Sequence, residues 1–130
     1  MNMHARQPRQ RQQQLHTALA DFIDFGHLER YTMGEPSLTR ELLQMFCDEL
    51  KHFRQADRGT REKERQAVHR LKGTARAVGA FPLAEAAAWL EKLLDADADE
   101  ADVRDARDDL NAHLDALSDA CRRWKEALLP

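Results

Sequence analysis

The segment AVHRLKGTARAVGA, residues 67–80, holds the side chains of this sequence that are best suited to chemistry. His69 is followed by two cations, Lys72 and Arg76, with Gly73 between them. At about 100° per residue these four residues share one face of a helix. A second face, roughly 130° away, carries Val68, Leu71, Ala75 and Val78. The apolar face belongs to the core, so His69 is predicted to lie on the surface.

An exposed imidazole beside two cations is suited to attack on an anionic electrophile. The cations favour the neutral ring, which is the nucleophilic form. Lys72 and Arg76 also offer positive charge to phosphoryl oxygens, where charge gathers during transfer. Gly73 costs a helix about 1 kcal/mol relative to alanine, yet it leaves bare backbone one turn beyond His69, where a partner can approach. The cluster therefore indicates phosphoryl chemistry at His69.

The elements that must position this cluster are helices. Apolar residues recur at helical spacing along most of the chain, and no stretch alternates as a half-buried strand does. Helices are expected at Gln12–Phe25, Pro36–Gln55, Thr60–Val78 and Phe81–Leu94, and a last one carries an apolar stripe from Val103 to Leu128. Breaks are expected at Gly26–Gly34, at the turn 57–59, at Gly79 and in an acidic linker over residues 95–109. The pattern predicts an all-α fold, an antiparallel four-helix bundle with an additional short N-terminal helix.

Composition limits the class of protein. The chain has 130 residues, of which 42% are hydrophobic and 33% charged, and its net charge is −3. These values fit a single helical domain and give no reason to expect nucleic acid or a membrane as partner. Residues 1–11 are rich in Gln and Arg and are expected to form a flexible tail or linker, with the domain at 12–130. No signal peptide or membrane-length apolar run is present, which predicts a cytoplasmic protein.

Other sites are not expected. Cys47 and Cys121 stand alone on apolar-facing positions and are predicted to be buried thiols, not a disulfide or a zinc site. Asp95, Asp97 and Asp99 resemble the start of a calcium loop, but Glu100 and Ala106 stand where such a loop needs glycine and glutamate. No nucleotide-binding motif is present. Neither a metal nor a cofactor is predicted for this chain.

The residues of the cluster resemble the HxLKG…G…L…LE pattern of histidine-containing phosphotransfer (HPt) domains. The matching positions are His69, Leu71, Lys72, Gly73, Gly79, Leu83 and Leu90-Glu91. Asp24, Leu28, Leu42-Leu43, Phe46 and Thr60 also stand where that family has similar residues. Arg70, Arg76 and Pro36 depart from what is frequent in the family.

The resemblance implies a four-helix bundle that accepts a phosphoryl group from the aspartyl phosphate of a receiver domain and passes it to another receiver. His69 would be the phosphoacceptor, usually through Nε2, and Lys72 the cation that stabilises the phosphate. Gly73 would provide clearance, and Arg76 an auxiliary charge. Such a module is a carrier without kinase activity, is expected to be a monomer, and leaves magnesium and the catalytic acids to the receiver.

Three other classes remain open at this stage. The dimerisation domain of a histidine kinase usually has an acidic residue and then a proline after its histidine, whereas Arg70 follows His69 and the next proline is Pro82. A structural or adaptor bundle would make the HRLKG segment a solvated helix face. A metal-binding bundle would use His52, His69 and His113, but these lack the Glu-x-x-His spacing. The sequence also leaves open the identity of the receivers, the direction of transfer, and whether the chain is free-standing or the last domain of a hybrid sensor kinase.

Overall fold

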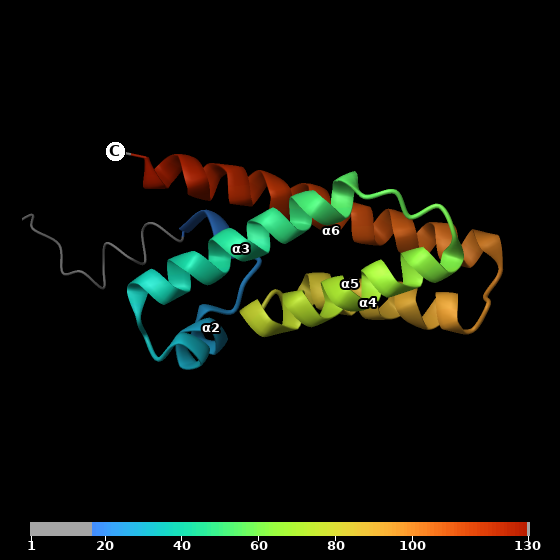
Figure 1. Ribbon diagram of the computed structural model, residues 1–130, viewed down its shortest axis with the longest axis horizontal. Helices are drawn as coiled ribbons and strands as arrows, with labels where there is room; N and C mark the ends of the chain where they lie inside the picture. The colour runs from blue at the N-terminus through green and yellow to red at the C-terminus, as the bar shows by residue number, and fades with distance from the viewer. Residues whose placement is uncertain (1–16, 130) are drawn as a thin grey trace, which may run out of the picture.

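The computed structural model describes residues 17–129, and in this range all regular elements are helices and no strand is present (Figure 1). The predicted all-α class is therefore confirmed. The elements are a 3₁₀ helix η1 (Thr17–Leu19) and the α-helices α2 (Phe25–Thr32), α3 (Pro36–Gln55), α4 (Arg61–Val78), α5 (Phe81–Asp95) and α6 (Glu100–Leu128).

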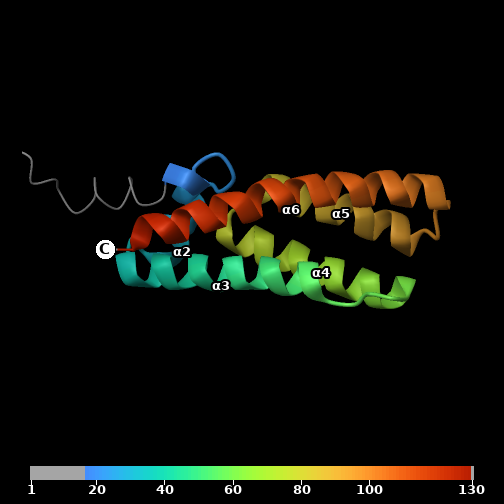
Figure 2. The ribbon, with the colours of Figure 1, turned by 90° about the horizontal axis from the view of Figure 1, so that it is seen from above.

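The four long helices run along the long axis of the molecule, as the two views show (Figures 1 and 2). The α4 helix packs most extensively on α5, which in turn packs on α6, and α3 contacts both α4 and α6. The short α2 lies at one end, against α3 and α4, and η1 packs on α6. Both α4 and α5 bury small side chains, among them Ala75 of α4 and Ala84 and Ala87 of α5.

The core is built from the apolar stripes of all four long helices. Trp124 and Phe46 are its largest fully buried side chains. The stripe of α6 is buried as predicted from Val103 to Trp124, and Leu128 is partly buried against the same core. For α5 the helical period predicts an inward face made of Leu83, Ala86, Ala87, Leu90 and Leu94. All five residues are buried, so this prediction is confirmed.

Both ends of α4 follow from local chemistry. The Thr60 hydroxyl accepts a hydrogen bond from the Lys63 N–H at 3.2 Å, which caps the first turn. Gly79 ends the helix with φ of 88°, and the N–H of Ala80 donates to the Ala75 carbonyl at 2.8 Å. A Cβ at Gly79 would lie 2.8 Å from the Asp24 carbonyl oxygen, so this position requires glycine for space as well as for conformation. The predicted start and end of α4 are confirmed.

The N-terminal part of the chain differs from the prediction. A helix was expected to end at Phe25 and a connecting segment to follow, whereas α2 begins at Phe25 and continues through Gly26 to Thr32. The reason is a local cap, because the Asp24 carboxylate accepts the His27 N–H at 3.1 Å and so starts a helix at the expected break. Residues 12–16 of the expected helix, and the tail at 1–11, lie outside the described residues.

Two further expectations need correction. The 3.6-residue period of α3 predicts a buried stripe made of Leu38, Leu42, Met45, Phe46, Glu49, Leu50 and Phe53. Leu38 and Met45 are exposed and Leu43 is buried, so the core-facing stripe is rotated from the predicted one. The acidic segment was expected to be a linker to residue 109, but α6 begins at Glu100. Asp99 starts it by accepting the Asp102 N–H at 3.0 Å, and the acids that follow are favoured at a helix N-terminus.

The two cysteines were predicted to be unpaired, and this was wrong. Cys47 of α3 and Cys121 of α6 are both buried, as expected, but the structure joins them in a disulfide with a Cα–Cα distance of 5.9 Å. Sequence spacing could not reveal the pair, since the two residues are 74 positions apart and meet only when α3 packs on α6.

None of the helices between residues 17 and 129 combines the length and the apolar character that crossing a membrane requires.

Candidate functional site

The polar face of α4 carries an exposed histidine, as the helical phase predicted. The side chain of His69 is 64% exposed. The apolar residues on the other face, Val68, Leu71, Ala75 and Val78, are all buried in the core. The core stripe therefore fixes the rotation of α4 about its axis, and that rotation places the imidazole at the surface.

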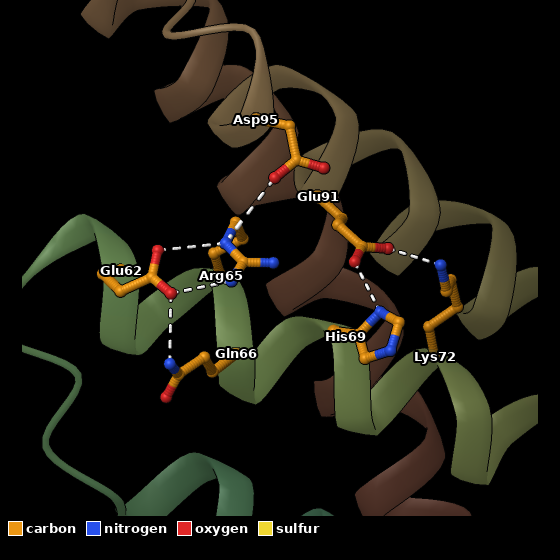
Figure 3. A network of polar contacts seen from close by, with 7 residues as sticks. All are labelled: Glu62, Arg65, Gln66, His69, Lys72, Glu91 and Asp95. Carbon is orange, nitrogen blue, oxygen red and sulfur yellow. Dashed lines mark hydrogen bonds and ion pairs between the residues drawn. The ribbon is translucent and has the colours of Figure 1, made fainter.

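The imidazole of His69 is hydrogen-bonded to a nearly buried carboxylate of α5, that of Glu91. The Nδ1 of His69 lies 2.6 Å from Oε2 of Glu91, which is on α5 and only 8% exposed. The other oxygen of Glu91, Oε1, accepts a hydrogen bond from Nζ of Lys72 at 2.5 Å. In Figure 3 the Glu91 carboxylate lies between the two side chains of α4. One buried carboxylate thus holds both predicted site residues.

The charge of Glu91 decides which nitrogen of His69 carries the proton. Burial alone would raise the pKa of Glu91, but hydrogen bonds from Lys72 and His69 and the positive charge of Lys72 outweigh it and lower the pKa below its usual value of 4.5. Glu91 is then ionised at neutral pH and only accepts hydrogen bonds. Nδ1–H must therefore be the donor to Oε2. In the neutral ring this leaves the lone pair on Nε2, which is free to act as a nucleophile.

The other predicted site residues take different positions. Gly73 lies beside open space, since a Cβ built there would meet nothing within 4 Å. The fold therefore does not need glycine at this point of α4. Arg76 is exposed and lines a cavity of about 460 Å³ with Phe81, Trp89 and Lys92 of α5. In the part of the chain that the structure describes, no hydrogen bond or ion pair joins Arg76 to His69 or Glu91.

A second charged network lies one turn before His69 (Figure 3). Arg65 donates two hydrogen bonds to Glu62, at 2.7 and 3.1 Å, and its Nε is 3.6 Å from Asp95 of α5. Hydrogen bonds from Arg65 and Gln66 lower the pKa of Glu62. These contacts add a polar link between α4 and α5 beside the His69–Glu91 pair.

Glu91 is the site residue whose role sequence reasoning missed. It was noted only as part of a family pattern, and its contact with His69 was not predicted. A signal was present, because His69 and Glu91 are equally far along the chain from Ala80, in the short turn that joins α4 to α5. Two helices joined by so short a turn are neighbours, so residues equidistant from the turn are brought side by side. Arg65 and Asp95 are related in the same way.

Fold and site together define a class, a helical domain that presents one exposed histidine held by a buried carboxylate. Comparisons with known proteins agree with it. The model of the Hpt domain family matches residues 39–120, which include four of the helices in whole or in part, among them α4 and α5. An X-ray structure of a rice protein named as a histidine-containing phosphotransfer protein superposes with a TM-score of 0.65 at 16% identity. The match covers 92% of this chain and 91% of that one. No curated protein matches the sequence at a significant level.

The chain belongs to the Hpt domain family. It is a phosphotransfer module of a phosphorelay, in which Hpt domains carry phosphoryl groups and pass them to receiver domains. The family match selects this class over the adaptor bundle, the kinase dimerisation domain and the metal-binding bundle.

Proposed function

We propose that His69 is the phosphoacceptor of this module and that Nε2 is the attacking atom. The observation that carries the proposal is the hydrogen bond from Nδ1–H to the ionised Glu91, which leaves the Nε2 lone pair on an exposed ring. A receiver domain delivers its phosphoryl group from an aspartyl phosphate. As the bond from Nε2 to phosphorus forms, the bond from phosphorus to the aspartate oxygen breaks, and the carboxylate stays with the receiver.

Glu91 makes this exchange possible without moving a proton. The hydrogen on Nδ1 stays in place throughout, so the phosphorylated ring becomes cationic, and its charge faces the Glu91 carboxylate at 2.6 Å. When the phosphoryl group leaves for the next receiver, the ring returns to the neutral form. Transfer in either direction therefore uses the same protonation state of Nδ1.

Lys72 and Gly73 have separate parts in this proposal. The ammonium group of Lys72 has three N–H donors, and Glu91 takes one of them. The others are available to phosphoryl oxygens bound at Nε2, so Lys72 stabilises the transferred charge while it holds Glu91 in place. Gly73 leaves the surface next to His69 low enough for the receiver to approach. Arg76, further along α4, adds positive charge at the edge of this face.

The test uses a receiver domain loaded with labelled phosphate in the presence of magnesium. We expect the wild-type chain to take the label and His69→Gln to take none, with His52→Gln, another exposed histidine, behaving as the wild type. The label should be labile to acid and stable to base, as a phosphohistidine is. Labelling of His69→Gln at the wild-type rate would contradict the assignment.

We further infer that α3 to α6 form an antiparallel four-helix bundle with α2 as an additional short helix, which is supported by the reversal of chain direction at each connection in Figure 1. The module is proposed to act in the cytoplasm as a monomer, with no cofactor of its own and with magnesium held by the receiver. Incubation with ATP and magnesium alone should leave the chain unlabelled, because a carrier takes its phosphoryl group only from a receiver. Light scattering tests the monomer.

A further inference from the structure

The disulfide joins the two helices that do not carry the phosphotransfer site. Cys47 is on α3 and Cys121 on α6, and both are among the buried residues of the core. They are the two cysteines of the chain, so no third thiol of the same chain competes for either sulfur. His69 and Glu91 belong to α4 and α5, and neither α4 nor α5 contributes a sulfur.

The disulfide is at the wall of a cavity. A hollow of about 600 Å³ between α3 and α6 is lined by both cysteines, by Lys51 and Arg54 from α3, and by Ser118 from α6, together with other residues of α6. The cysteines are 4% and 5% exposed, so a large protein surface cannot reach them, but a small molecule inside the cavity lies against the sulfurs. The volume is sufficient for a thiol of the size of dithiothreitol or for the cysteinyl part of glutathione.

We propose that Cys47–Cys121 is a reversible thiol–disulfide exchange site, served by low-molecular-weight thiols that enter this cavity. A thiolate attacks one protein sulfur, forms a mixed disulfide with it, and releases the other cysteine as a thiolate that takes a proton. A second small thiol then attacks the mixed disulfide at the sulfur that came from the first small thiol, and the protein cysteine leaves as a thiolate. The products are two protein thiols and one small disulfide, and the two electrons come from the small thiols.

Reduction of the disulfide lowers the stability of the domain and leaves the phosphotransfer site unchanged. The cross-link closes a loop between residues 74 positions apart, which restricts the unfolded chain strongly. Without it, α3 and α6 are held together by side-chain packing and by ion pairs such as Arg54–Asp115, at 2.7 Å. The hydrogen bonds of His69 and Lys72 with Glu91 join α4 to α5 and do not depend on the disulfide. The redox state of the thiol pool thus sets how long the folded carrier persists.

The first experiment establishes the bond on the full chain. After treatment with oxidised glutathione, we expect the mass to fall by two hydrogen atoms, free thiols to disappear, and the thermal midpoint to exceed that of the reduced chain by about 10 °C or more. The variant Cys47→Ser/Cys121→Ser should match the reduced chain under both conditions. Two thiols that remain free, or intermolecular dimers in place of the internal bond, would overturn the proposal.

The second experiment tests entry through the cavity. Ser118→Phe places a ring in the cavity and should slow reduction of the folded chain by glutathione by about tenfold or more, whereas Ala116→Phe, on the exposed side of the same helix, should change the rate less than twofold. Equal rates in the two variants would show that the sulfurs are reached by another route. Phosphotransfer rates of the oxidised and reduced chains should agree within twofold at temperatures where both are folded, and a larger difference would overturn the separation of redox state from transfer. None of the thiol measurements depends on His69, so they stand or fail apart from the assignment of the phosphoacceptor.

Discussion

Glu64 and Glu91 are two nearly buried glutamates, each 8% exposed, and each binds a cationic side chain of a neighbouring helix. Glu64, on α4, is gripped by one arginine of α6, since Nε and Nη2 of Arg107 donate to its two oxygens at 2.8 and 2.9 Å. Glu91, on α5, divides its oxygens between His69 and Lys72. The first pair is complete in itself, whereas the second leaves a ring nitrogen directed away from the carboxylate.

The two glutamates differ in whether their partner keeps an atom that can react. The bidentate pair satisfies both carboxylate oxygens with a single planar partner and raises the pKa of Arg107, chiefly through the hydrogen bonds to Glu64. It links α4 to α6 and offers no lone pair to a reactant. The hydrogen bonds of Glu91 also link two helices, but in addition they orient the imidazole of His69. A buried carboxylate therefore becomes a functional residue through the partner it holds.

The sharpest test exchanges each glutamate for alanine. Glu91→Ala frees the ring of His69 and removes the charge that stabilises the phosphorylated form, so transfer should slow by about 10- to 100-fold, as for other partners that orient an imidazole. Glu64→Ala should leave the transfer rate within about twofold but lower the free energy of unfolding by about 1.5–3 kcal/mol, the range for hydrogen bonds to charged groups. Receiver-dependent labelling and urea unfolding measure the two effects.

An intermediate variant, Glu91→Gln, separates the hydrogen bond from the charge. Its amide oxygen can still accept from Nδ1–H, so this variant should be faster than Glu91→Ala. The comparison between Glu91 and Glu64 would fail if Glu64→Ala slowed transfer as much as Glu91→Ala in chains that remain folded.

The second test compares two glycines, Gly73 within α4 beside the site and Gly79 at the C-terminal end of the same helix. Gly73→Leu should slow transfer by about tenfold or more, a barrier increase of about 1.4 kcal/mol or more, because a side chain there blocks the receiver. Gly73→Ala should stabilise the helix by about 0.8–1 kcal/mol, since its Cβ meets open space. Gly79→Ala should destabilise the fold by about 1–3 kcal/mol, because φ is 88° and the Asp24 oxygen is too close.

Wild-type transfer in Gly73→Leu would remove the steric role of Gly73. Loss of transfer in a chain that circular dichroism shows to be unfolded would not bear on it, so each variant is compared at a temperature well below its own thermal midpoint.

Much of this contrast could be predicted from sequence, and the reason differs by residue. The rotation of α4 was predictable because four apolar residues and His69 obey one period, and Gly79 because a helix end favours the left-handed conformation. The start of α2 could not be predicted, since a single helix cap at Asp24 outweighed the break expected at Gly26. The Cys47–Cys121 pair depends on which distant helices pack together, and periodicity along one helix does not contain that information. The Glu91 contact also lies outside the periodicity of one helix, and its signal in the sequence was the short turn that makes α4 and α5 neighbours.

The third test removes the cation of each glutamate. Lys72→Ala should slow transfer by about three- to tenfold, a barrier increase of about 0.6–1.4 kcal/mol, because the phosphoryl oxygens lose a cationic donor, and it should leave the domain folded. Arg107→Ala should destabilise the domain and leave transfer within about twofold, because Arg107 contacts no residue of the site among its ion pairs with Glu64 and Glu100. An unchanged rate in Lys72→Ala would show that the lysine serves only to hold Glu91.

The smallest expected effect is a dependence of stability on pH that comes from Glu91. Its pKa is lowered in the folded chain, because the hydrogen bonds and charges of Lys72 and His69 outweigh the effect of burial. A lowered pKa means that the folded state binds the proton less readily than the unfolded state does. The contribution of Glu91 to stability is therefore complete above its ordinary value of 4.5 and is lost as the pH falls through the lower folded value.

Glu91→Gln supplies the reference, because it removes this titration and keeps the shape of the side chain. The difference in the free energy of unfolding between the wild type and Glu91→Gln should shrink as the pH falls below 4.5, as measured by urea denaturation at a series of pH values. A difference that stays constant over that range would mean that the hydrogen bonds to Glu91 do not favour its ionised form. The proton on His69 Nδ1 would then have no fixed acceptor, and the orientation of Nε2 would have to come from packing alone.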